Sequence, residues 1–127
     1  MAKKILVIED DRDIADLVKL VLETTKDFEV ETVLDPVTAY QKAKSFRPEA
    51  ILLDLTMPKM DGWAVFKMIR SDASFADVPI GILTAKSQQF DEMVGLHIMN
   101  ADAYITKPFG KQELIDKTYE LFNKGKK

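Results

Sequence analysis

The chain has 127 residues, a length that suits one domain of ordinary size and leaves no room for a second. Hydrophobic residues make up 46% and charged residues 31% of it, as in a water-soluble globular protein. The net charge of -3 argues against a surface that coats nucleic acid, and the lack of cysteine excludes disulfides, thiolate metal ligands and a cysteine nucleophile.

The N-terminal apolar run is too short to act as a targeting signal. Residues 5–8 are apolar, but Glu9, Asp10 and Asp11 follow at once. The sequence nowhere approaches the roughly 18 uninterrupted apolar residues that a membrane-spanning helix needs. We therefore expect a cytoplasmic protein that contacts no membrane.

Five short apolar runs predict strands. They lie at residues 4–8, 28–34, 50–55, 78–84 and 103–106. Three of the runs are apolar on both side-chain parities, which is typical of strands that are buried on both faces of a parallel sheet. The run at 28–34 alternates polar and apolar residues instead, so we expect it at an edge of the sheet.

Amphipathic stretches between these runs predict helices. The first spans residues 14–22, where apolar residues recur three and four positions apart. Pro36 suits the first position of a second helix that ends near Phe46, with Asp35 as its cap. Further helices are expected around residues 65–69, 90–97 and 114–122. The strict alternation predicts an α/β fold, a doubly wound (βα)5 parallel sheet.

Reactive side chains follow several of the predicted strands. Asp10 and Asp11 follow the first, Asp54 lies near the end of the third, Thr84 ends the fourth and Lys107 follows the fifth. In open α/β sheets ligands bind beyond the carboxyl ends of the strands, near the point where the strand order reverses. These side chains therefore predict one functional site.

Asp54 is the strongest candidate, because a carboxylate at the rim of a core is costly to bury without a partner. As isolated residues, Asp54 could cap a turn, Thr84 could be an ordinary β-branched strand residue, and Lys107 could be solvated. Their common location favours function. Gly81, by contrast, has a structural meaning: it weakens the fourth strand or admits a closely packed helix.

Asp10 and Asp11 have two possible roles. Either could cap the first helix, and we expect one of them to do so. Beside Asp54, however, the pair would repel unless a cation lies between the carboxylates. Mg²⁺ suits such a set of oxygen ligands, whereas a zinc site would require histidine or cysteine partners.

With these residues identified, the sequence resembles the receiver domain of two-component response regulators. The matching segments are ILVIEDD at 5–11, LLDLTMPKMDG at 52–62, ILTA at 82–85 and YITKPF at 104–109. They occur in the same order as in that family, at the ends of the first, third, fourth and fifth predicted strands, and they span nearly the whole chain. The resemblance implies a flavodoxin-like sheet of order 2-1-3-4-5, which places the first and third strands side by side.

The resemblance also implies the extent of the domain and its metal ligands. We expect a single receiver domain over residues 1–127, with a core of about 3–122 and a short basic tail at 123–127. Asp54 would be the phosphoacceptor, and Asp11 and Asp54 would bind Mg²⁺ directly. Asp10 would assist through water, and the backbone carbonyl of Thr56 would supply a further ligand.

The remaining roles that the resemblance implies concern the phosphoryl group and the switch. Thr84 would hydrogen-bond the phosphoryl group, Lys107 would pair with it, and Tyr104 would change rotamer together with Thr84. The Lys107–Pro108 peptide bond would be cis. A sensor histidine kinase or phosphotransfer protein would donate the phosphoryl group. Output would pass by protein contact through the face of the fourth helix, fifth strand and fifth helix, to a target that the sequence does not identify. Partner choice would lie on that face and around the first helix.

Two other functions remain open at this stage. A phosphatase of the haloacid dehalogenase type also uses an aspartyl nucleophile, a threonine and a lysine, but its second aspartate would stand at the position of Thr56. A flavodoxin-like binding module would work without phosphorylation. We expect no dedicated enzyme, and a monomer or phosphorylation-dependent dimer. The start at Met1 and the lysine-rich end favour a stand-alone receiver over an excised domain.

Overall fold

The computed structural model describes residues 2–55, 62–85 and 101–124. Five strands form one parallel sheet in the order β2-β1-β3-β4-β5. The strands are β1 (Lys3–Ile8), β2 (Phe28–Val33), β3 (Ala50–Asp54), β4 (Ile80–Ala85) and β5 (Ala103–Lys107). The helices are α1 (Arg12–Glu23), α2 (Ala39–Phe46), α3 (Gly62–Arg70) and α5 (Lys111–Lys124), with the short 3-10 turns η1 (Pro36–Thr38) and η2 (Ala73–Phe75).

The predicted doubly wound sheet and its strand order are confirmed. The helix expected around residues 90–97 lies outside the described residues. Among the residues that the structure describes, no helix is both long enough and apolar enough to cross a membrane.

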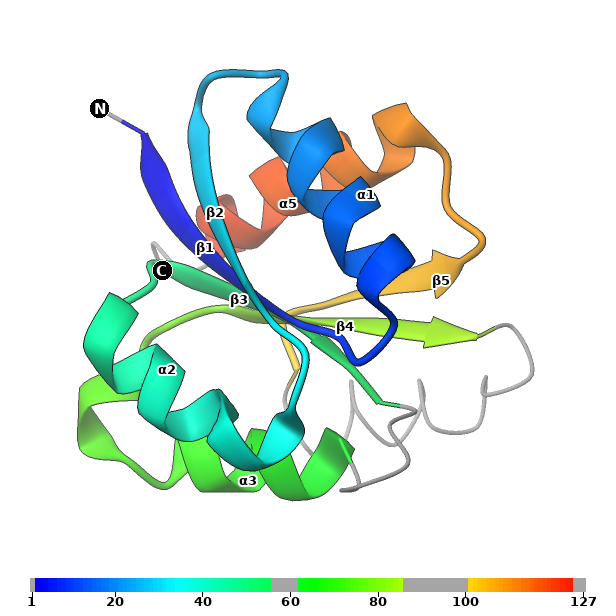
Figure 1. The fold of residues 1–127 in the computed structure, drawn as a ribbon. Coiled ribbons are helices and arrows are strands. Elements are labelled where there is room, and N and C mark those ends of the chain that lie inside the picture. Colours follow the sequence, from blue (N-terminus) through cyan, green and yellow to red (C-terminus); the bar gives the residue numbers. More distant parts are fainter. Residues whose placement is uncertain (1, 56–61, 86–100, 125–127) are drawn as a thin grey trace.

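Helices cover both faces of the sheet, with α1 and α5 on one side and α2 and α3 on the other (Figure 1). Alternate residues of β1 account for this arrangement. Ile5 and Val7 belong to the core beneath α1 and α5, whereas Leu6 and Ile8 belong to the core beneath α2 and α3. All four side chains are fully buried, as the prediction of strands that are apolar on both parities requires.

β2 is an edge strand, as its alternating pattern predicts. Its main-chain groups at Val30 bind side chains of α1. The amide of Val30 donates to Glu23 Oε2 at 3.0 Å, and its carbonyl oxygen accepts from Lys19 Nζ at 2.5 Å. Lys19 and Glu23 also form an ion pair at 3.3 Å. The helix thereby satisfies backbone groups that an edge strand would otherwise leave open.

The second helical stretch begins differently from the prediction. Asp35 does cap it, because its side chain accepts a hydrogen bond from the amide of Val37. The amide of Thr38, however, binds the carbonyl oxygen of Asp35 at 3.1 Å, and this three-residue spacing makes Pro36 the start of a 3-10 turn. The α-helix itself starts at Ala39.

Gly81 allows α5 to pack closely against β4. A Cβ atom at this position would lie 3.1 Å from Leu52 Cδ2 and 3.3 Å from Leu121 Cδ2. Both distances are shorter than ordinary carbon contacts. Of the two roles expected for this glycine, close packing of a helix is the one observed.

Arg70, at the end of α3, ties together the segments that enter β4 and β5. Its Nη1 donates to the carbonyl oxygens of Phe75 and Val78 at 3.0 and 2.6 Å, and its Nη2 donates to Asp102 Oδ2 at 3.0 Å. The same oxygen of Asp102 accepts from the amide of Ile80 at 2.8 Å. These bonds anchor the amino end of the sheet.

Candidate functional site

The carboxyl ends of β3, β4 and β5 bring three of the predicted site residues together. Asp54 is the last residue of β3 and pairs in register with Leu83, next to Thr84 in β4. Lys107 is the last residue of β5. Asp54 and Thr84 are only 2% and 1% exposed, so a polar cluster lies at the rim of the core.

Lys107 joins two buried acids. Its Nζ lies 2.7 Å from Glu9 Oε1 and 3.3 Å from Asp54 Oδ1. Glu9 directly follows β1, the neighbour of β3, and is 1% exposed. The ammonium group therefore reaches Glu9 and Asp54 from across the sheet.

The electrostatics show an excess of negative charge. Burial and the hydrogen bond with Asp54 raise the pKa of Glu9 to about 7, although Lys107 acts in the opposite direction. Burial by itself would lower the pKa of Lys107, but the hydrogen bond to Glu9 and the charge of Asp54 outweigh it and raise the pKa. One ammonium group therefore does not fully compensate the acids that surround it.

A group of three carboxylates could hold a metal ion here. Glu9, Asp10 and Asp54 each offer an oxygen, and these oxygens all lie within 4.8 Å of one another. Carboxylate oxygens gathered around one point are the ligands that hard divalent cations prefer. The donor set therefore fits the kind of ion that the sequence analysis expects.

Asp11 has a different position from the one implied by the family resemblance. Its Oδ1 accepts from the amides of Asp13 at 2.9 Å and Ile14 at 3.3 Å, so Asp11 is the N-cap of α1. The expectation that one of the two aspartates caps this helix is met by Asp11. The acid grouped with Asp10 and Asp54 is Glu9, which was not among the residues predicted from the sequence.

Thr84 and Tyr104 lie on the same face of the sheet. The register pairs Ile82 with Tyr104 and Thr84 with Thr106, so the two residues are diagonal neighbours on β4 and β5. Tyr104 is 7% exposed and packs in the core beneath α2 and α3. The Lys107–Pro108 peptide bond is cis, as predicted. Thr56 lies outside the described residues.

A groove opens next to the acidic cluster. Its volume is about 310 Å³, and it is lined by Ile14, Leu17, Lys107, Pro108 and Phe109. Its walls are mainly apolar, and Leu17 is 48% exposed. Apolar side chains thus border Lys107 on the outer surface.

Comparison with known proteins supports the resemblance. Residues 5–119 match the family model of the response regulator receiver domain. The chain is 40% identical to the alkaline phosphatase synthesis transcriptional regulatory protein PhoP of Bacillus subtilis over 114 residues, which are 90% of this chain and 46% of that protein.

Other relatives agree. The DNA-binding dual master transcriptional regulator RpaA of Synechocystis is 36% identical over 95% of this chain and 49% of its own length. Among solved structures, chemotaxis response regulator CheY4 of Vibrio cholerae superposes with a TM-score of 0.86 at 27% identity, covering 95% of this chain and 99% of that one. The chain thus spans about half the length of the curated relatives it matches. It belongs to the response regulator receiver domain family, the phosphorylation-activated switches of two-component signalling.

Proposed function

We propose that Asp54 is the phosphoacceptor of this receiver. The observation that carries the proposal is the pairing of Asp54 with Lys107 at 3.3 Å, at a strand end where Glu9 and Asp10 complete an acidic group. The donor is a phosphohistidine on a sensor histidine kinase or phosphotransfer protein. The ionised Asp54 oxygen forms a P–O bond as the P–N bond breaks, and the imidazole, already protonated at its other nitrogen, leaves as the neutral ring.

Glu9, Asp10 and Asp54 are the residues that would hold Mg²⁺, with the backbone carbonyl of Thr56 as a further proposed ligand. When bound, Mg²⁺ would neutralise negative charge on the acids and on the phosphoryl oxygens. Glu9 replaces Asp11 in this assignment because Asp11 Oδ1 is engaged in capping α1. Metal binding would also offset the repulsion among the carboxylates.

Lys107 and Thr84 would act on the phosphoryl group directly. Transfer of a phosphoryl group demands little beyond positioning and stabilisation of charge, and an ammonium already held beside Asp54 supplies both. The Thr84 hydroxyl would donate a charge-assisted hydrogen bond once Asp54 carries the phosphoryl group. A receiver that assists its own phosphorylation in this way is not a dedicated enzyme.

Tyr104 would carry the change from the site to the output face. The shared sheet face means that movement of Thr84 toward the phosphoryl group alters the space beside the Tyr104 ring. Two populations of the surface at β5 and α5 would then be rebalanced, to the extent that each binds the phosphoryl group differently. Replacing Thr84 by Ala should leave Asp54 phosphorylatable and abolish the phosphorylation-dependent change in Tyr104 side-chain NMR signals.

The groove of Ile14, Leu17 and Phe109 suits the docking of the phosphodonor. It borders Lys107, so a helix bound there would present its histidine to Asp54. The aliphatic side chains Leu17 and Leu20, 48% and 66% exposed on α1, extend the apolar surface. Output by a further domain or by a separate protein is equally compatible with a receiver that spans half of its relatives.

Intact-mass analysis tests the proposal. The wild type, treated with a small phosphodonor and Mg²⁺, should gain one phosphoryl group, and Asp54→Asn should gain none. Asp102→Asn is a matched control at the other end of the sheet and should be labelled like the wild type. Labelling of Asp54→Asn to the wild-type extent would refute Asp54 as the acceptor, and an unlabelled wild type would favour a module that works without phosphorylation.

A further inference from the structure

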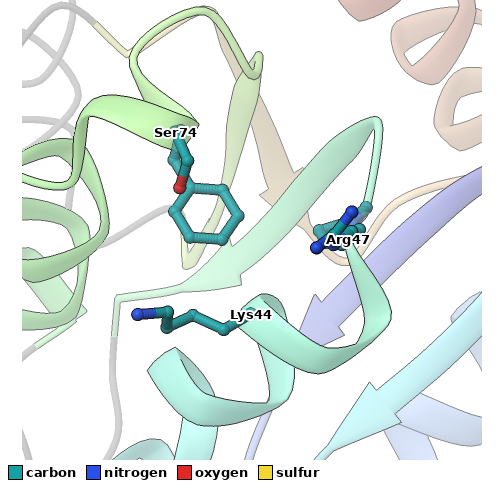
Figure 2. A pocket seen from close by; sticks show the side chains of 5 residues that line it. Lys44, Arg47 and Ser74 are labelled. Atoms are coloured by element: carbon teal, nitrogen blue, oxygen red, sulfur yellow. The ribbon is translucent and has the colours of Figure 1, made fainter.

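A second pocket lies at the opposite end of the sheet from Asp54. Its volume is about 440 Å³, and it is lined by Lys44, Arg47, Pro48, Ser74 and Phe75. α2 and Pro48 lead into β3, and η2 leads toward β4, so the pocket lies near the amino ends of these strands. Figure 2 shows Lys44 below the pocket, Arg47 to its right and Ser74 above it.

The two cations of this pocket form no ion pair with a described acid. Among the residues that the structure describes, neither Lys44 nor Arg47 takes part in an ion pair, whereas Lys19, Lys42 and Arg70 each do. Lys44 Nζ lies 5.4 Å from the centre of the Tyr40 ring. Lys44 acts electrostatically on Asp72, but two cations beside this carboxylate still leave the pocket with an excess of positive charge.

The nearby carboxylate of Asp72 is occupied by other groups. Its Oδ1 accepts from the amide and the hydroxyl of Ser74, at 2.9 and 2.7 Å, and its Oδ2 accepts from the Tyr40 hydroxyl. These hydrogen bonds, above all the one from Tyr40, lower the pKa of Asp72 to about 2. Asp72 therefore stays ionised and holds Ser74 in place, and the charge of Lys44 contributes to the lowered pKa.

The backbone at Arg47 adds a second observation. Arg47 ends α2 with a φ of 56°, in the left-handed region that a helix end usually gives to glycine. A residue that breaks a local rule of this kind often has a functional role that compensates for it. Here the left-handed turn puts the guanidinium at the pocket that Lys44 also lines.

From these features we infer that the pocket binds a phosphate group, carried by a small organic molecule. Arg47 offers a planar, forked set of donors and Lys44 a compact ammonium, and together they suit a phosphate dianion. The pocket is larger than inorganic phosphate requires, and Pro48 and Phe75, both buried, form an apolar floor for an organic group. This inference is independent of phosphorylation at Asp54.

Amide NMR of the metal-free protein tests the inference with three probes at matched ionic strength: inorganic phosphate, adenosine 5′-monophosphate and adenosine. The two phosphates should give saturable shifts at residues 44–48 and 72–76, and adenosine should give none. Tighter binding of the nucleotide than of inorganic phosphate would support an organic phosphate as the ligand, and equal binding would overturn the organic part of the inference. Shifts near Glu9, Asp54 and Lys107 would report the other site separately.

Two substitutions remove the charges with little change in backbone. Lys44→Met keeps the aliphatic stem, and Arg47→Asn tolerates the left-handed conformation. Each should weaken phosphate binding at least about tenfold. Lys67→Gln, an exposed position of α3 outside the pocket, should bind like the wild type. Unchanged binding in both charge variants, equal binding of adenosine, or no saturable shift up to about 10 mM would overturn the inference.

Discussion

The two ends of the sheet differ in how well their buried and half-buried charges are compensated. At the amino end, Arg70 and Asp102 are 23% and 27% exposed, and the hydrogen bonds of the pair include two carbonyl oxygens and an amide. At the carboxyl end, Glu9 and Asp54 are almost completely buried, and among the described residues both pair with the ammonium group of Lys107. The first network is balanced, and the second carries surplus negative charge.

This difference separates stabilising charges from functional ones. A charged network whose partners are all present fixes the segments that it joins, whereas a buried acid in excess of its counter-charges costs stability. Such an excess is useful where a cation and a phosphoryl group are to bind. Substitutions at the amino end should therefore destabilise the protein, and neutralising an acid at the carboxyl end should stabilise it.

The largest change in stability is expected for Arg70→Ala. The substitution removes the donor of three hydrogen bonds and leaves Asp102 without its cation, which should lower the free energy of unfolding by about 2–3 kcal/mol. Urea denaturation measures the loss. Lys67→Ala on the exposed side of the same helix is the control and should lie within about 0.5 kcal/mol of the wild type. Equal losses of unfolding free energy in the two variants would mean that the hydrogen bonds of Arg70 do not stabilise the protein.

Glu9→Gln should raise the free energy of unfolding, whereas Arg70→Ala should lower it. Because the pKa of Glu9 is raised from 4.5 to about 7, the metal-free wild type should lose stability as the pH rises between these values. The folded state retains a proton there that the unfolded state has already released. The variant should lose this dependence and, above pH 7, be more stable than the wild type by on the order of 2 kcal/mol.

Urea denaturation from pH 4 to 8, without divalent cations, measures this effect of Glu9→Gln. Glu29→Gln, on the exposed side of β2, should keep the wild-type pH dependence. A variant that is less stable than the wild type at pH 8 would show that Glu9 is fully compensated, contrary to the comparison between the two ends.

Gly81→Ala should destabilise the protein by about 1–2 kcal/mol, because the new methyl group would press on Leu52 and Leu121. Thermal or urea unfolding measures it. Gly110→Ala, where an added Cβ meets nothing within 4 Å, is the matched control and should be neutral or slightly stabilising. A neutral Gly81→Ala would indicate that α5 can move away from β4 without cost.

The smallest effect on stability is expected for substitutions of Asp11. These substitutions also distinguish the role of Asp11, as a helix cap, from the proposed role of Asp10, as a metal ligand. Asp11→Ala should cost about 1 kcal/mol through loss of the cap, and Asp11→Asn should retain most of the stability. In Mg²⁺ titrations Asp11→Asn should bind nearly as well as the wild type, whereas Asp10→Asn should bind at least about tenfold more weakly. The reverse order of affinities would return Asp11 to the metal site.

Much of the fold could be predicted because short stretches of the sequence carry the pattern of each strand and helix. Apolar runs on both parities identify the central strands, the alternation in β2 identifies an edge, and the strand ends carry Asp54, Thr84 and Lys107. Asp35 and the proline that follows it also mark a helical start. The initial 3-10 turn could not be foreseen, because it depends on which of two carbonyl groups the Thr38 amide binds.

The structure groups Glu9, and not Asp11, with Asp10 and Asp54, and the sequence holds a signal for this arrangement. Asp11 stands three residues before Ile14, the spacing of an N-cap and the amide that it binds, so the two acids before it were left for the site. The Arg70 network and the pocket at Arg47 had no such signal. Both depend on segments distant in sequence and on a left-handed residue that no local pattern predicts.

The contact between α1 and Val30 also limits how this protein can assemble. Lys19 and Glu23 occupy both main-chain groups of Val30, in the middle of the strand that ends the sheet. A strand from another chain would have to displace both side chains and break their ion pair before it could pair there. This stretch of the edge is therefore protected against sheet extension, the route by which exposed strands form aggregates.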